Sequence, residues 1–264
     1  MSRRALRQVA RGGALAGLAA AVACSGSLPP LRGQMEVGRD AYAVFVAGGG
    51  AAGGDLYAVR TEGGSVVPIT FSSVGEMRPA LSPDGASLAF LRGASARDST
   101  PGTVWVMNLL SGAERQITLL KGSEAPSRVG WTADGRALVV ATRTQVYSSE
   151  APPRPTIARP VTGADRTKAE STLAVLLGRP AFARVVPCAE PEALCVAADT
   201  GRPGLLARGA RDAARWGDDS VMFFLGDAVE IRPLGPGRAR RLDWEGVPPR
   251  PRQMTVFPGV TSPR

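Results

Sequence analysis

Short apolar runs separated by turns make up most of this sequence. Residues 88–91 and 138–140, for example, are apolar runs that follow directly on turns containing Asp and Gly. No window keeps the 3.6-residue period of an amphipathic helix over several turns. The pattern therefore predicts an all-β fold built from many short strands, and it excludes a solenoid of helical repeats.

One motif, a turn followed by an apolar strand, recurs along the chain. Residues 82–91 and 132–140 share it closely, residues 216–224 share it with the glycine replaced, and residues 38–45 are a weaker copy. The turn aspartates stand at positions 40, 84, 134 and 218, so their gaps are 44, 50 and 84, and 84 is twice 42. We therefore expect a degenerate copy near position 176, with residues 182–186 as its apolar strand.

The chemistry of the turn explains its residues. Pro fixes φ at the first turn position, Asp accepts hydrogen bonds from backbone N–H groups two residues on, and Gly takes the left-handed conformation that closes the hairpin. We therefore predict that Asp84, Gly85, Asp134 and Gly135 are structural rather than catalytic.

Each copy continues into a third strand, a polar turn and a closing strand. Four strands in a unit of 42 to 50 residues is the size of a propeller blade. The sequence predicts a β-propeller of four-stranded antiparallel blades over residues 34–258, with five blades, and six as the alternative. Residues 252–257 alternate in polarity, and they either close the ring or begin a truncated sixth blade. Residues 259–264 form a tail.

The repeat is similar to that of a known family. Residues 79–85, 104–108 and 116–118 resemble the repeat of TolB-like β-propellers, which is also found in the propellers of prolyl-oligopeptidase-like proteins. The resemblance covers roughly residues 34–244 and is strongest in the second unit. It implies a propeller, usually six-bladed, that binds protein partners in the bacterial envelope through one face or the central channel.

Charge and composition narrow the chemistry. The formal net charge of +9 comes almost wholly from arginines, which are scattered and have no aromatic platform beside them. We therefore expect a soluble surface and no nucleic-acid partner. Histidine is absent, which excludes Ser-His-Asp and Cys-His catalysis and His-ligated zinc. No paired-carboxylate motif stands out, so the sequence predicts no catalytic, cofactor-binding or metal-binding residue.

Residues 1–23 have the pattern of a secretory signal peptide. A basic start is followed by an apolar run over residues 14–23 and by small residues before Cys24. Residues 21–24 resemble a bacterial lipobox, with Ala21 where such motifs usually carry Leu, and they also fit simple cleavage. We predict lipidation of Cys24 and a flexible tether over residues 24–33. Residues 2–7 also resemble a twin-arginine signal, so the export route stays open.

Two further cysteines and one long insertion complete the candidate features. Cys188 and Cys195 lie on either side of one predicted hairpin, and an even pair in an exported domain indicates a disulfide. Two buried thiols are the alternative. Residues 149–168, which contain four prolines, are expected to form a long surface loop with one strand in it.

From these features we expect a non-enzymatic lipoprotein, exported to the periplasmic face of the cell envelope and bound to the membrane through its lipid. Ser25 replaces the Asp that commonly retains lipoproteins at the inner membrane, which favours the outer membrane. The propeller would act as a scaffold for an envelope protein partner. The alternatives are a propeller that senses a ligand by binding carbohydrate or peptide, and a metal-dependent lactonase or hydrolase with inward-facing carboxylates.

Overall fold

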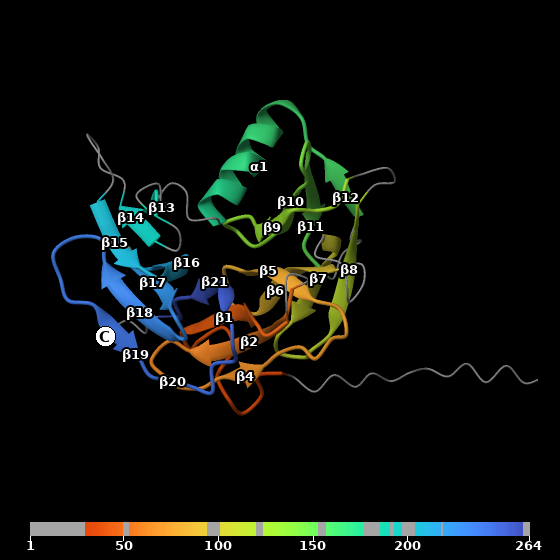
Figure 1. Cartoon of the computed structure of the whole chain (residues 1–264). Helices are drawn as coiled ribbons and strands as arrows, with labels where there is room; N and C mark the ends of the chain where they lie inside the picture. The colour runs from red at the N-terminus through yellow and green to blue at the C-terminus, as the bar shows by residue number, and fades with distance from the viewer. Residues whose placement is uncertain are drawn as a thin grey trace, which may run out of the picture.

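The computed structural model describes residues 30–49, 53–93, 101–119, 124–152, 157–176, 185–190, 193–196, 204–217 and 219–260. In these residues the chain forms short strands and one helix (Figure 1). The strands group into five blades, two of which share a continuous eight-stranded sheet. The prediction of an all-β propeller with five blades is confirmed for this part of the chain.

The strands follow one plan, in which neighbours within a blade are antiparallel. Blade 1 contains β21 (Arg252–Phe257), β1 (Tyr42–Ala47), β2 (Asp55–Arg60) and β4 (Val67–Pro68). Blade 2 contains β5 (Glu76–Leu81), β6 (Ser87–Gly93), β7 (Pro101–Asn108) and β8 (Glu114–Leu119). Blade 3 contains β9 (Arg128–Trp131), β10 (Ala137–Ala141), β11 (Val146–Glu150) and β12 (Ile157–Pro160). Blade 4 contains β13 (Val185–Pro187), β14 (Ala193–Val196) and β15 (Gly204–Arg208). Blade 5 contains β16 (Ala210–Trp216), β17 (Ser220–Leu225), β18 (Ala228–Pro233) and β19 (Arg240–Leu242).

The blades stack radially because each central strand sends alternate side chains to opposite neighbours. In β1, Val44 packs with blade 2 and Phe45 packs with blade 5. In β6, Phe90 packs with blade 1 and Leu91 packs with blade 3. The same alternation in β17 joins blade 5 to blade 4 and to blade 1. The described sheets therefore stack face to face in the order 4, 5, 1, 2, 3.

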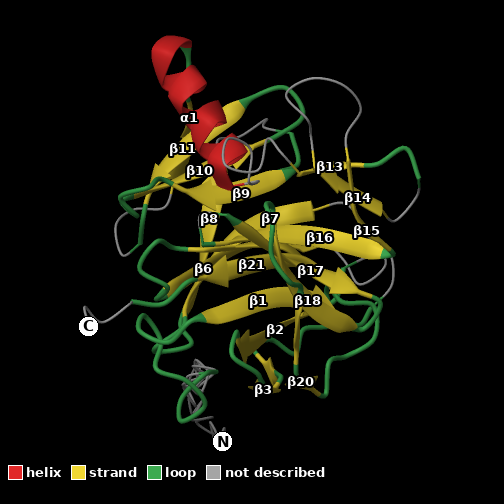
Figure 2. Ribbon diagram, turned by 90° about the vertical axis from the view of Figure 1, so that its left-hand side faces the viewer, coloured by secondary structure: helices red, strands yellow, loops and turns green. Residues whose placement is uncertain are grey.

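Four blades meet at the centre of the propeller through their innermost strands, β5, β9, β16 and β21. At the centre, β21 contacts both β16 and β5 (Figure 2). β21 pairs antiparallel with β1, so that Phe257 lies opposite Tyr42. Of the two predictions for residues 252–257, the closing strand is confirmed. Blade 1 is therefore assembled from two distant parts of the chain.

Short parallel pairings also join blades at the outer rim. β12 of blade 3 pairs with β8 of blade 2, with Ile157 opposite Thr118. β20 (Trp244–Glu245), which follows blade 5, pairs with β3 (Gly64–Ser65) of blade 1. These pairings occupy strand edges that would otherwise be free to recruit other chains.

The predicted loop over residues 149–168 is only partly correct. It contains the expected strand, β12, but the helix α1 (Gly163–Leu176) begins within it and lies over the face of blade 3 that is turned away from blade 2 (Figure 1). Of residues 163–170, Ala169 alone is buried, against Val139 and Val146. An ion pair of 2.8 Å between Arg166 and Glu170 supports the exposed side. A helix segment that buries one alanine gives no apolar period to read, which is why the pattern missed it.

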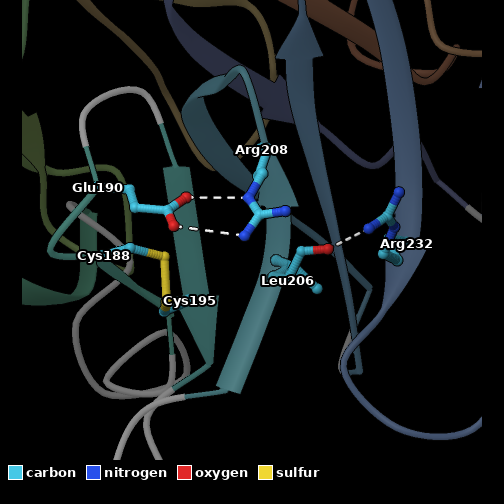
Figure 3. Close-up of a disulfide and its surroundings, with 6 residues drawn as sticks. All are labelled: Cys188, Glu190, Cys195, Leu206, Arg208 and Arg232. Carbon is cyan, nitrogen blue, oxygen red and sulfur yellow. Dashed lines mark hydrogen bonds and ion pairs between the residues drawn. A yellow bond between two sulfur atoms is a disulfide. The ribbon is translucent and has the colours of Figure 1, made fainter.

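Blade 4 departs from the predicted repeat. Position 176, where we expected a degenerate copy of the turn, is the last residue of α1. The strand expected over residues 182–186 is present as β13 (Val185–Pro187), while residues 182–184 lie outside the described residues. The structure joins Cys188 to Cys195 by a disulfide across the β13–β14 hairpin, with the two Cα atoms 5.3 Å apart (Figure 3).

Replacing both cysteines by serine should lower the free energy of unfolding by about 2–3 kcal/mol, because the bridge closes a short loop and restricts the unfolded chain. Urea titration followed by tryptophan fluorescence measures the difference. Adding dithiothreitol should destabilise the wild-type protein by a similar amount and leave the double variant unchanged. Two reactive thiols from these positions in denatured, unreduced protein would contradict the bridge.

Candidate functional site

The two ends of the propeller differ in chemistry. At one end, the turn face, lie the Asp-Gly turns that connect the inner strand to the next strand in blades 2 and 3. Asp84 Oδ1 accepts a hydrogen bond of 3.0 Å from the Ala86 N–H, and Asp134 Oδ1 accepts one of 3.1 Å from the Arg136 N–H. Gly85 and Gly135 have φ values of 66° and 68°, which suit glycine. All four residues are thus placed to shape the turns.

The opposite end, where the inner strands begin, carries an unusual backbone feature. β5, β16 and β21 each contain a β-bulge, and Arg78, Asp212 and Gln253 occupy equivalent positions in it with φ values of 55°, 51° and 54°. Non-glycine residues with positive φ are uncommon and cost of order 1 kcal/mol or more each. A bulge breaks the alternation of side chains between neighbouring blades. Arg78 and Asp212 are accordingly exposed at the inner strands.

Four arginines lie at the start of inner strands at this end of the molecule, which we call the arginine face. Each of the inner strands β5, β9, β16 and β21 carries an arginine within its first three residues: Arg78, Arg128, Arg211 and Arg252. The acidic residues in the same four strands are Glu76, which is fully buried, and Asp212. The start of the described inner strands therefore has a surplus of positive charge.

Arg252, at the start of β21, is partly removed from water. The residue is half-buried, and burial lowers the pKa of its guanidinium, an effect that Asp212 opposes and that Arg250 reinforces. A cation that is partly removed from water beside a second cation gains more from an anionic ligand than a fully hydrated one does. The arrangement is suited to a ligand that brings carboxylates or phosphates to the arginine face.

Side chains from neighbouring blades occupy the inner edge of β5. The Arg78 N–H donates to Gln253 Oε1 at 2.7 Å, and the Trp131 indole N–H donates to the Ala80 carbonyl at 2.9 Å. These backbone groups are already bonded, so a ligand cannot add a strand there. Recognition along the inner edge of β5 must therefore use side chains.

The sequence interpretation missed this site because the arginines look scattered along the chain. A signal was present, however: Arg78 and Arg128 each stand six positions before a turn aspartate, Asp84 and Asp134. A fixed offset from the turn places both residues at the same level of successive inner strands. The offset, rather than local clustering, identifies the shared face.

The turn face holds a second candidate, a depression of about 290 Å³ in blade 1. Its lining includes Arg39, Asp40, Arg60 and Glu62. Arg60 pairs with Asp40 at 2.9 Å, and Arg39 pairs with Glu36 at 2.8 Å. Because these charges are largely matched within the protein, the depression offers a weaker site for a charged ligand than the arginine face.

Cys24 lies outside the described residues. In the ranges that the structure does describe, no three Cys, Asp or Glu residues come together as a metal site would require. The helix in those ranges is neither long nor apolar enough to cross a bilayer.

Comparison with known proteins gives structural similarity at low sequence identity. No family model matches the sequence, and no curated protein does. The chain is similar to TolB from Acinetobacter baumannii, with 13% identity and a TM-score of 0.35 over 81% of this chain and 66% of that one, so it spans just under two thirds of that TolB chain. It is also similar to a structure of a nidogen/laminin complex (13% identity, TM-score 0.39, 84% and 82% of the two chains). A third similar structure is the periplasmic gluconolactonase of Pseudomonas aeruginosa (16% identity, TM-score 0.33, 77% and 67%).

The structure itself supplies the features by which such a fold is recognised. Its described sheets stack radially, the last strand closes the first blade, and Asp-Gly turns recur in blades 2 and 3. In fold, the chain is a β-propeller.

Proposed function

We propose that this protein is a non-enzymatic binding scaffold of the bacterial cell envelope, and that its arginine face holds an acidic segment of a protein partner. The observation that supports this most directly is the presence of an arginine at the start of four inner strands, β5, β9, β16 and β21. Positive charge concentrated on one face favours encounter with an acidic partner and disfavours basic ones.

The location belongs to the same proposal. The signal-like residues 1–23 and the lipobox-like residues 21–24 support export, with lipidation of Cys24 holding the propeller to the periplasmic side of the outer membrane. Metabolic labelling with palmitate tests the anchor. The wild-type protein should take up the label and the Cys24→Ser variant should not, and an unlabelled wild type would remove the anchor from the proposal.

Charge reversal tests the binding face. The variant Arg78→Glu/Arg128→Glu should retain its stability, because both side chains are exposed. Its capture of the partner from cross-linked cells should fall at least about tenfold, and wild-type capture should weaken with added salt. Arg159→Glu, an exposed change on the outer strand β12, is the matched control and should capture normally.

The same experiment separates the alternatives. Undiminished capture by the double variant would show that the arginine face is not the binding site. Saturable binding of a soluble sugar or peptide, with no captured protein, would favour a sensor. Stabilisation by a divalent metal together with lactone hydrolysis would favour an enzyme.

A further inference from the structure

Phe71, in the loop between β4 and β5, is the most exposed large apolar side chain among the described residues, with 83% of its surface accessible. Single exposed apolar residues are common on soluble proteins and need no special explanation. What distinguishes Phe71 is that the loop carrying it is held firmly on both sides.

The residue before Phe71 is anchored in the interior. Thr70 is 5% exposed, and its hydroxyl accepts a hydrogen bond of 2.9 Å from the Leu56 N–H. The same hydroxyl donates to Glu76 Oε2 at 3.2 Å. Thr70 is therefore fixed to blade 1 and to the first residue of blade 2.

The residue after Phe71 is anchored as well. The Ser72 N–H donates to Asp55 Oδ1 at 3.1 Å, and the Ser72 hydroxyl donates to the Val74 carbonyl at 2.6 Å. With both neighbours fixed, the phenyl ring is presented to solvent on a backbone with little freedom to move. An aromatic side chain held this way loses little conformational entropy when it binds.

Glu76 ties the loop to the sheet. Its side chain is fully buried and receives hydrogen bonds from Thr70 and from Arg92 Nε, the latter at 3.1 Å. Burial raises the pKa of Glu76, while Arg92 and the hydroxyls of Ser72 and Thr70 lower it. A buried ion pair often adds little stability compared with apolar residues of the same size. The hydrogen bonds of Glu76 do, however, fix the position of the loop.

Phe71 and the arginine face lie at the same end of the propeller. The loop that carries Phe71 leads directly into the start of β5, and Arg78 is the third residue of that strand. Leu110, the other large exposed apolar residue of blade 2, follows the end of β7 and is therefore at the turn face. The basic side chains and the rigid phenyl ring thus share one surface.

We propose that Phe71 is the apolar anchor of the protein-binding surface: it enters an apolar pocket of the partner, and acidic residues around that pocket meet the arginines. Glu76 is a positioning residue for this contact. The inference rests on the proposed function. It favours a folded protein over a lipid surface because the loop offers one ring, flanked by serine and threonine, instead of the several apolar side chains that insert into a bilayer.

A photo-crosslinking residue at position 71 tests the contact directly. Phe71→p-benzoylphenylalanine, expressed in cells in the full chain, should yield an adduct with one envelope protein, and Leu110→p-benzoylphenylalanine should not. The captured protein is then purified and titrated against the wild type and single variants. Phe71→Ala should weaken binding about 30-fold, as expected for a central anchor, whereas Phe71→Trp should retain most of the affinity and Leu110→Ala all of it.

A double-mutant cycle tests the role of Glu76. Glu76→Gln should weaken binding in the wild-type background and change nothing further in the Phe71→Ala background, because its effect passes through the ring. Equal losses in both backgrounds would contradict a positioning role. Thermal melting of each variant confirms that the titrated protein is folded.

The outcomes separate this inference from the proposed function. If the arginine variants lose binding but Phe71→Ala does not, or if position 71 yields no adduct beyond that of position 110, the anchor is wrong and the scaffold function stands. If neither the arginine nor the Phe71 variants change capture, both proposals fail. Binding to vesicles of equimolar phosphatidylcholine and phosphatidylglycerol that depends on Phe71 would indicate a membrane surface and overturn the protein anchor.

Discussion

Phe257→Ala should destabilise the propeller by about 3–5 kcal/mol, the usual loss when a buried phenyl ring is truncated. Phe257 is 5% exposed, and its ring centroid lies 5.7 Å from that of Tyr42. It also packs on the turn of blade 2 so closely that a Cβ on Gly85 would stand 2.7 Å from the ring. One side chain of the closing strand thus contacts both blade 1 and blade 2.

Thermal denaturation followed by circular dichroism measures the effect, which we expect to lower Tm by roughly 10 °C for a domain of this size. Val260→Ala is the control, because Val260 lies just beyond the same strand and is 65% exposed. It should change stability by less than about 0.5 kcal/mol. Similar small shifts in Tm for both variants would mean that β21 does not hold the propeller closed.

Arg92→Met should also destabilise the protein by about 3–5 kcal/mol at neutral pH, because it leaves the Glu76 carboxylate buried without its cation. Arg92 is 15% exposed and bridges Glu76, at 3.1 Å, to Glu114, at 2.9 Å, while its guanidinium lies 4.5 Å from the centre of the Trp105 ring. Methionine keeps much of the apolar contact of the stem, so the lost charge is the main change.

The loss should depend on pH. Burial raises the pKa of Glu76 above that of an ordinary carboxyl group. A carboxyl group with a raised pKa binds its proton more tightly in the folded state than in the unfolded state. Its contribution to stability is therefore complete below the pKa of the unfolded state and is lost as the pH rises through the pKa of the folded state. Removing Arg92 raises the folded pKa further. The variant's deficit should therefore be largest at neutral pH and shrink toward about pH 4, near the ordinary value for a glutamic acid.

Urea unfolding of wild type and variant across this pH range provides the measurement. Adding Glu76→Gln to Arg92→Met should recover part of the stability at neutral pH, since the buried group is then uncharged. A deficit that is the same at every pH would show that packing, not charge, accounts for the contribution of Arg92.

The sequence predicted the blades where local chemistry alone decides the structure. The turns at Asp84 and Asp134 are formed by hydrogen bonds within a few residues, so their pattern can be read without knowledge of the fold. The closing strand could be expected only as one of two alternatives, because its pairing with β1 joins positions that are far apart in the chain.

The site was harder to predict because it depends on how the strands are arranged around the centre. The bulges place Arg78, Asp212 and Gln253 at positive φ, a conformation that is uncommon for Arg and Gln. The helix α1 was missed because Ala169 is the one residue buried in its described first half, 163–170. Phe71 looks like any loop residue until the hydrogen bonds of Thr70 and Ser72 are known.

The closing strand has a consequence for how the molecule is made. Because β1 must wait for β21, the first blade stays one strand short, with a bare edge, until the ribosome has added residue 257. Pairing between such distant positions is slow to form. The growing polypeptide therefore cannot complete its first blade before residue 257 has been made, however early the strands of blades 2 and 3 are available.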